Sequence, residues 1–261
     1  MPRAKVTGSA ADFIPPNPTL DRLRAAAAGC RGCELYLDAT QTVFGEGRVS
    51  ADLMFVGEQP GDQEDRVGRP FVGPAGRMLD EALEAAGIAR DTVYVTNAVK
   101  HFRFVRNELI KRRLHKKPSA GQVRACNPWL REELKLLQPK LVVALGSTAA
   151  QALLGTAFKV TQHRGEVVSS AWAGPVLATV HPSSILRAPA EYRADAKREF
   201  FEDVGKAAVY LRSRSAAGAT RPTARSDKRL TPASTRPASS SVRAERSSRS
   251  PDRSSRAKRG T

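Results

Sequence analysis

Four short apolar runs, separated by segments with helical periodicity, restrict the folds open to this chain more than any other feature. The runs cover residues 52–57, 92–97, 140–145 and 175–181, and each has the length and β-branched content of a strand. Strands that alternate with helices predict a parallel sheet covered by helices on both faces. The sequence therefore predicts an α/β fold.

Helices are expected before, between and after these strands. A helix that Thr19 can cap runs to Gly29, and a closing helix covers residues 191–211. The internal helical segments open with Pro or Ser, as helices often do, and they cover residues 74–86, 119–137 and 147–154.

Composition divides the chain into a body and a tail. With 261 residues and 41% hydrophobic content, we expect one main domain over residues 19–212, after a flexible N-terminus at residues 1–18. Residues 213–261 consist largely of Ser, Arg, Pro, Ala and Thr, which cannot offset the entropy cost of ordering. We expect this tail to be disordered.

Body and tail are both basic. The formal net charge is +17, and residues 213–261 hold thirteen Lys/Arg against three Asp/Glu. Each neutralised phosphate releases condensed counterions, so this balance favours nucleic acid ahead of a membrane surface as partner. A basic tail alone gives only non-specific affinity.

The sequence argues against several other protein classes. It has no run of 18 apolar residues and no charged N-terminal region followed by a hydrophobic run, so we expect a cytoplasmic protein of the bacterial cytosol that does not enter a membrane. Three cysteines, an odd number without an export signal, argue against a disulfide framework.

Residues just after the strands are the candidate ligand-binding positions, because ligands of such sheets sit beyond the carboxyl ends of the strands. Glycine-rich segments at residues 57–62 and 68–76 allow close backbone approach, and Phe71 offers a flat face for stacking. Asn97 can read the edge of a base, although a turn Asn is the simpler reading. His181 can stabilise charge on a leaving group and Arg187 can hold a phosphate, although a His-Pro pair is usually a turn.

Two further segments carry chemistry. Cys30 and Cys33 form a CxxC pair, which together with Cys126 suits a zinc site, a redox pair, an iron–sulfur cluster or no metal at all. In the segment 111–118, five basic residues flank His115, which predicts a loop that binds phosphates. A solvated basic loop with an incidental histidine is the alternative.

Taken together, these motifs resemble family 4 of the uracil-DNA glycosylase superfamily over about residues 20–210. The family's Gly-Glu-Ala-Pro-Gly, Pro-Phe-Val-Gly and His-Pro-Ser motifs correspond here to residues 57–61, 70–73 and 181–183. The resemblance implies a three-layer α/β/α sandwich around a four-stranded parallel sheet, and a monomer that acts on uracil-containing, single-stranded DNA. It also implies substrate-binding positions at Gly57, Asp62, Phe71, Asn97, Ser183 and Arg187.

The resemblance assigns chemical roles to these positions. Phe71 would stack on the extruded uracil and Asn97 would read its edge, while His181 would bond the oxygen that gains charge as the base leaves. Glu58 would stabilise the cationic sugar or position a water.

The family also carries a 4Fe–4S cluster held by four cysteines, and this chain has three. The family's third cysteine stands in a Val-Lys-Cys-Arg context, where this chain has His101 after Val99-Lys100. The expected ligands are therefore Cys30, Cys33, Cys126 and His101, because imidazole is an accepted iron ligand. His163 is the next candidate, and a cluster completed otherwise or absent remains the alternative.

One branch of the family, UdgX, shares two departures seen here. Gln59 replaces the usual alanine, and Lys-Arg-Arg-Leu-His at residues 111–115 resembles the loop whose histidine bonds to the sugar once uracil has left. This resemblance implies that His115 captures the sugar, with Glu58 and Gln59 in support, while Lys111, Arg112 and Arg113 contact DNA phosphates. An ordinary turnover glycosylase and a non-catalytic iron–sulfur protein that binds nucleic acid are the competing hypotheses.

Overall fold

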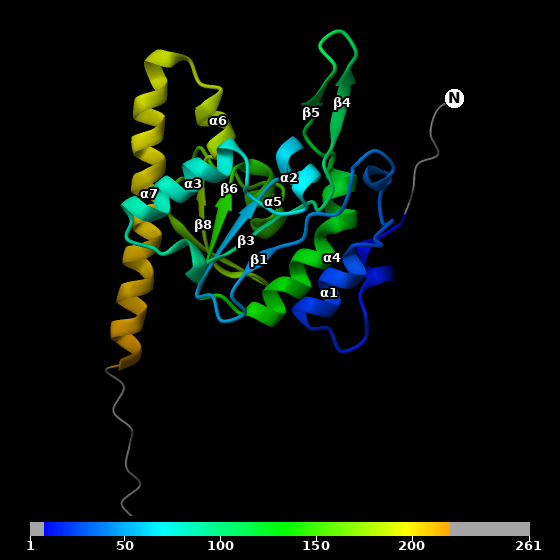
Figure 1. The fold of residues 1–261 in the computed structure, drawn as a ribbon. Coiled ribbons are helices and arrows are strands. Elements are labelled where there is room, and N and C mark those ends of the chain that lie inside the picture. Colours follow the sequence, from blue (N-terminus) through cyan, green and yellow to red (C-terminus); the bar gives the residue numbers. More distant parts are fainter. Residues whose placement is uncertain (1–7, 220–261) are drawn as a thin grey trace, which may run out of the picture. The chain divides into compact units, whose positions relative to one another are not determined.

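A mixed six-stranded sheet lies at the centre of the computed structural model, which describes residues 8–219 (Figure 1). Its strand order is β1-β3-β2-β6-β8-β7, and the inner four strands pair in parallel. These four confirm the predicted strands: β2 (Leu53–Gly57), β3 (Tyr94–Asn97), β6 (Leu141–Leu145) and β8 (Gly174–Thr179).

Two antiparallel edge strands extend the sheet beyond the sequence prediction. β1 (Glu46–Gly47) pairs with β3, and β7 (Val167–Ser170) pairs with β8. β1 has only two residues and β7 is largely exposed, so neither shows the continuous apolar run that marks the inner strands.

Helices cover both faces of the sheet and give the three-layer α/β/α arrangement. On one face, α3 (Pro74–Ala85), α6 (Pro182–Leu186) and α7 (Ala190–Ala219) share a core with the side chains of β2 and β8. On the other face lie α1 (Leu20–Ala27), α4 (Ala120–Leu137) and α5 (Ser147–Leu154). Burial of apolar side chains on both faces fixes the sheet, because a parallel sheet needs both faces covered.

The N-terminal segment is more ordered than the sequence predicts. Ala10–Phe13 forms a 3-10 helix, η1, whose Ser9 and Asp12 exchange hydrogen bonds with the backbone in a capping box. Ala10 is fully buried in a cluster with Trp129 of α4. Within residues 8–18, where we expected flexibility, the structure thus has a capped and partly buried turn, while residues 1–7 lie outside the described part.

The closing helix is also longer than expected. α7 continues to Ala219, so residues 213–219 are helical where we expected disorder. The rest of the expected disordered tail, residues 220–261, lies outside the described residues.

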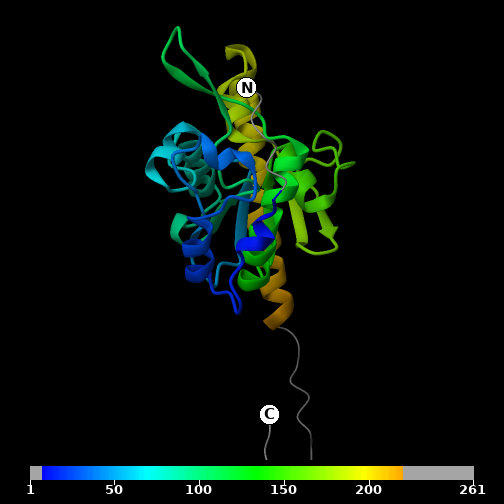
Figure 2. The same cartoon turned by 90° about the vertical axis from the view of Figure 1, so that its right-hand side faces the viewer.

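Where the sequence indicated a basic loop, the structure has a two-stranded hairpin. β4 (Phe104–Asn107) pairs antiparallel with β5 (Arg112–His115), and the hairpin stands away from the sheet (Figures 1 and 2). Three short elements complete the described fold: α2 (Asp62–Val67), η2 (Glu34–Leu37) and η3 (Arg90–Thr92). No helix in residues 8–219 combines the length and apolar character needed to cross a bilayer.

Candidate active site

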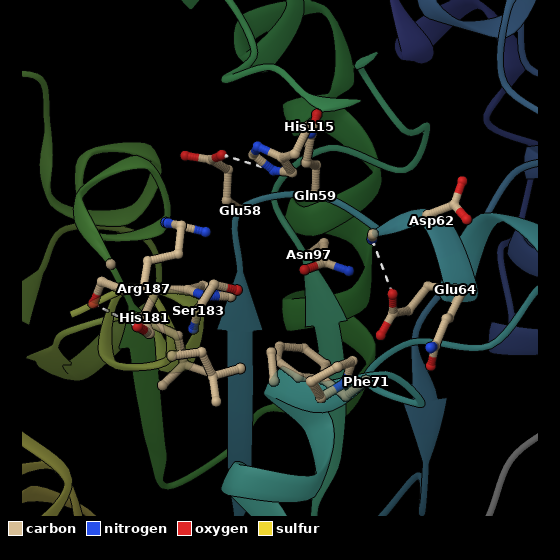
Figure 3. A pocket seen from close by; sticks show the side chains of 18 of the residues that line it. Glu58, Gln59, Asp62, Glu64, Phe71, Asn97, His115, His181, Ser183 and Arg187 are labelled. Atoms are coloured by element: carbon tan, nitrogen blue, oxygen red, sulfur yellow. Dashed lines mark hydrogen bonds and ion pairs between the residues drawn. The ribbon is translucent and has the colours of Figure 1, made fainter. Parts of the chain in front are cut away.

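The carboxyl ends of the four parallel strands open into a cleft of about 870 Å³ (Figure 3). Glu58, Asn97, Gly146 and His181, which line it, stand at or just after the ends of β2, β3, β6 and β8. This placement follows the general rule for α/β sheets. The cleft brings together most residues singled out from the sequence, namely Glu58, Gln59, Asp62, Phe71, Asn97, Lys111, Arg112, Arg113, His115, His181, Ser183 and Arg187.

Glycines allow the aromatic wall of the cleft to form. Phe71 adopts a left-handed backbone conformation with φ of 57°, and a Cβ on Gly76 would collide with its carbonyl group. A Cβ on Gly57 would collide with the Phe71 ring and with the Asn97 amide, so a larger residue at this strand end would displace them. The Phe71 ring lies stacked near His181, with ring centroids 6.4 Å apart.

Asn97 presents an amide to the floor of the cleft (Figure 3). Its residue is 2% exposed, and within the described chain no hydrogen bond is made by its side chain. Because Asn97 lines the cleft and its amide makes no hydrogen bond to the described part of the protein, both ends of the amide are available to a ligand. Its main-chain carbonyl is held by the Lys100 Nζ at 2.9 Å.

A buried ion pair, which no pattern in the sequence indicated, lies next to this strand end. Lys100 and Glu133 of α4 both have fully buried side chains, with Nζ and Oε2 2.5 Å apart. Glu133 also accepts hydrogen bonds from the hydroxyl groups of Tyr94 and Thr96. Every charged atom therefore has a partner, as buried charges require.

His181 is a neutral imidazole with a fixed tautomer. As the N-cap of α6, its Nδ1 accepts the backbone N–H of Ser183 at 3.1 Å. Burial, together with His115 and Arg187, lowers its pKa to about 4. The ring is therefore uncharged at neutral pH, and its proton must sit on Nε2, because Nδ1 acts as an acceptor.

His115 lies at the rim of the cleft, at the end of β5, beside Glu58 (Figure 3). Its Nε2 is 3.5 Å from Glu58 Oε1, and Glu58 Oε2 accepts the hydroxyl group of Thr148. Desolvation and the charge of Arg187 lower the pKa of His115, while Glu58 opposes that shift. At neutral pH the imidazole thus keeps a lone pair available. The sequence did not indicate Thr148.

Gln59 secures the base of the β4–β5 hairpin. Its Nε2 donates to the carbonyl groups of Arg103 and Lys116, and its Oε1 accepts the N–H of Arg103, each at 3.1 Å. Both polar atoms of its side chain thus bind the backbone at the base of the hairpin that carries His115. An alanine could make none of these bonds.

Arg113 takes a different place from the one expected for a phosphate contact. Its guanidinium lies against the rings of Phe102 and Phe104 and pairs with Asp62 at 2.5 Å and with Asp65 at 2.6 Å. Its side chain is only 11% exposed. Two carboxylates on α2 draw it inward, so it anchors the hairpin.

The other two basic residues expected at DNA remain available. Lys111 and Arg112 are exposed and line the cleft. Neither makes a salt bridge within residues 8–214, where the side chains are described.

Glu64 is a positioning residue that the sequence analysis did not identify. This side chain, with its residue 8% exposed, accepts the N–H of Gly73 at 2.8 Å and that of Gly61 at 3.1 Å. It thereby joins the two glycine-rich segments, the second of which carries Phe71. The available signal was its place at the third position of α2, where a glutamate closes a capping box.

The three cysteines gather in one buried cluster under η1 and beside α4. The charges of Cys30 and Cys33 both influence Cys126, whose pKa burial raises to about 12. The Lys100 N–H donates to Cys126 Sγ and the Trp129 indole N–H donates to Cys30 Sγ. Among residues 8–219, no group of three or more His, Cys, Asp or Glu side chains is arranged to hold a metal ion.

His101 has the tautomer that a metal ligand needs. Thr42 donates its hydroxyl proton to the Ala27 carbonyl, so its oxygen must accept a proton from His101 Nε2 at 2.8 Å. Burial lowers the pKa of His101 to about 4, which leaves Nδ1 with a lone pair. His163, the second candidate, instead pairs with Glu166 on the surface.

Comparison with known proteins gives a consistent set of relatives. The model of the uracil DNA glycosylase superfamily matches residues 44–205. The type-4 uracil-DNA glycosylase of Thermotoga maritima is 34% identical over 184 residues, covering 70% of this chain and 90% of the relative. Those of Pyrobaculum aerophilum and Archaeoglobus fulgidus are 34% and 32% identical, covering 66% and 69% of this chain and 86% and 91% of theirs.

Proposed function

Because this chain belongs to the uracil DNA glycosylase superfamily, we propose that it cleaves the glycosidic bond of uracil in DNA and then captures the sugar covalently through His115. The observation that carries the proposal is the convergence on one cleft of an amide without a hydrogen bond to the described residues, a carboxylate and two neutral imidazoles. These groups are Asn97, Glu58, His181 and His115.

Uracil is recognised after it has been extruded from the strand. The Asn97 amide can donate to one uracil carbonyl and accept from the ring N–H, a pairing that needs both of its functional ends. Phe71 offers its face to the base, and the missing Cβ of Gly57 leaves room for close approach. A single-stranded substrate fits best, because no base pair has to be opened first.

Cleavage leaves the electron pair of the C1′–N1 bond on uracil. The Nε2–H of His181 stabilises this developing charge by donating a hydrogen bond. Because the pKa of His181 is low, the ring is already neutral at neutral pH when it does so. Glu58, held by Thr148, stabilises the positive charge that appears on the sugar.

Capture by His115 follows. The ring nitrogen without a proton gives its lone pair to C1′ and forms a C–N bond, and the ring then loses its remaining N–H proton, with the Glu58 carboxylate nearby as acceptor. The new bond has no good leaving group, so the protein acts once. Gln59 and Arg113 contribute by holding the hairpin in place.

The test is incubation of the protein with single-stranded DNA that carries one uracil, followed by denaturing gel electrophoresis. We expect a shifted band that survives boiling in detergent, and its loss in His115→Ser. His163→Ser is the matched control, because this exposed histidine lies outside the cleft and should leave the band intact. Absence of the band in the unaltered protein would refute the capture step.

The type-4 relatives favour a second candidate, a glycosylase that releases uracil with turnover. In that case water takes the place of His115, and Glu58 orients it. Free uracil in excess of protein, without a detergent-stable band, would select this candidate.

We further propose that Cys30, Cys33, Cys126 and the Nδ1 of His101 hold a 4Fe–4S cluster. The N–H donors at two sulfur atoms and the tautomer of His101 suit such ligands. The cluster would serve structure, by tying the N-terminal segment to α4. The purified protein should contain iron and acid-labile sulfide and absorb in the visible range, and Cys126→Ala should lose both properties.

A further inference from the structure

The β4–β5 hairpin carries exposed apolar side chains beside the cleft, where a bound DNA strand could contact them. We call Val105, Leu109, Ile110 and Leu114 the apolar strip. We propose that this strip is a stacking platform for unpaired bases of the uracil-containing strand, several nucleotides from the uracil. The inference rests on the proposed function for the position of the uracil.

The strip is unusual for its concentration of exposed apolar side chains. Its members are 49%, 95%, 54% and 40% exposed, in chain order. They account for four of the eleven large exposed apolar side chains in the described residues, within ten positions. Single exposed apolar residues are ordinary, whereas four on one hairpin indicate a binding surface.

The hairpin's pairing explains how the strip forms. Val105 and Leu114 are cross-strand partners, so they share one face of the hairpin. Leu109 and Ile110 lie in the turn, where Asn107 Oδ1 accepts both of their N–H groups at 3.1 and 3.3 Å. The turn is thus built to display these side chains.

The hairpin is fixed to the body at its other end. Gln59 binds both of its flanks, and Arg113 binds the carboxylates of Asp62 and Asp65. An anchored platform loses less entropy on binding than a mobile loop. Leu114 also lines the cleft, so the strip begins at the mouth of the candidate active site.

Charge identifies the chemistry of the partner. Five exposed basic residues surround the strip, against one exposed acidic residue, Glu108; they are Arg106, Lys111, Arg112, Lys116 and Lys117. A partner must therefore be polyanionic and must also offer flat apolar surfaces. Single-stranded DNA has both properties, because its phosphates alternate with unstacked bases.

Strand geometry sets the expected position of the contact. Ile110 is five residues from His115, and because Lys111 is in a left-handed turn outside β5, the two lie at most about 17 Å apart. This span equals about five nucleotides of a stacked DNA strand, and fewer of an extended one. Leu109 and Ile110, at the far end of the strip, should therefore contact bases up to about five nucleotides from the uracil, on one side only.

The test compares the unaltered protein with Leu109→Ser/Ile110→Ser in a scan of single abasic spacers, which remove a base and keep its phosphate. Each oligonucleotide carries one uncleavable 2′-fluoro-deoxyuridine, and binding is measured by fluorescence anisotropy. A spacer at the contact position should weaken binding of the unaltered protein about fivefold, as loss of a small apolar contact would. The double variant should bind about fivefold more weakly with all bases present and should not respond to that spacer.

Two controls separate bases from phosphates and from general damage. Val49→Ser, another exposed apolar residue, should behave like the unaltered protein. Arg112→Gln should reduce the salt dependence of binding, whereas the double variant should leave it unchanged.

Several results would overturn the proposal. They are unchanged affinity of the double variant, equal sensitivity to spacers at every position, and sedimentation showing self-association that the double variant abolishes. The last result would make the strip a contact between copies. A uracil-free oligonucleotide separates this failure from that of the proposed function. If the protein does not recognise uracil, the DNA binds in no fixed register and no single spacer position stands out. The double variant should nevertheless bind uracil-free DNA more weakly than the unaltered protein.

Discussion

His115 titrates between two charged neighbours, and this makes the capture step dependent on pH. Burial and Arg187 lower its pKa from the ordinary 6.5, and Glu58 raises it. Capture needs the neutral ring, so its rate should rise with pH through the lowered pKa and level off before neutrality. Arg187→Gln removes a cation that disfavours imidazolium, so the pKa and the acid limb should move to higher pH.

Single-turnover rates of adduct formation at saturating DNA, across the acidic to neutral range, measure this shift. Arg66→Gln is the matched control, because Arg66 lines the cleft but does not influence the pKa of His115. An acid limb that stays in place or moves to lower pH in Arg187→Gln would contradict the assignment of His115.

The buried pair of Lys100 and Glu133 should be the most sensitive polar contact for stability. Lys100→Met leaves the Glu133 carboxylate buried without its cation, which costs about 3–5 kcal/mol. Chemical denaturation should show this loss in the free energy of unfolding. Lys140→Met breaks an exposed pair with Asp52 and should cost less than about 1 kcal/mol. A similar small cost for both variants would show that the buried pair has little importance.

At the scale of elements, the β4–β5 hairpin links Gln59 at its base to the position of His115. Gln59→Ala removes three hydrogen bonds at its base, each worth about 1 kcal/mol. We expect the hairpin amides to exchange hydrogen faster, and the adduct to form about tenfold more slowly, because His115 is less well positioned. Amide exchange by mass spectrometry and quenched gels measure the two effects.

Gln151→Ala is the control for this experiment, because Gln151 makes a single side-chain bond to the Phe158 carbonyl. Exchange in the hairpin should be unchanged in that variant. If Gln59→Ala slowed adduct formation without any faster exchange, Gln59 would have to act at the reacting centre itself.

The elements differ in how far the sequence reveals them. The inner strands are predictable because buried parallel strands are continuous apolar runs, as 141–145 shows. The hairpin is not, because its two strands have only four residues each, and its turn has no Asn-Gly or Asp-Gly pair.

The same contrast holds within the site. Asn97 and His181 are visible because they stand at strand ends, whereas Glu64 and Thr148 act through contacts with distant segments. The inward turn of Arg113 depends on carboxylates 48 and 51 residues away in sequence, so a local basic pattern could not indicate it. Such long-range partners exist only in the folded chain.

At the scale of the whole molecule, charge is shared between the folded body and residues 220–261, which hold twelve Lys/Arg and three Asp/Glu. Removing residues 220–261 should weaken DNA binding and reduce its salt dependence, because fewer counterions are released. The rate of adduct formation at saturating DNA should be unchanged, since Glu58, Asn97, His115 and His181 all lie in the body.

Binding measured over a series of salt concentrations gives the slope, and quenched gels give the rate. A full-length variant with the Lys and Arg residues of 220–261 changed to Gln separates charge from length, and it should match the truncation. If the truncated protein lost adduct formation even at saturating DNA while the Gln variant kept it, the segment would contribute more than charge. The catalytic unit would then extend beyond residue 219.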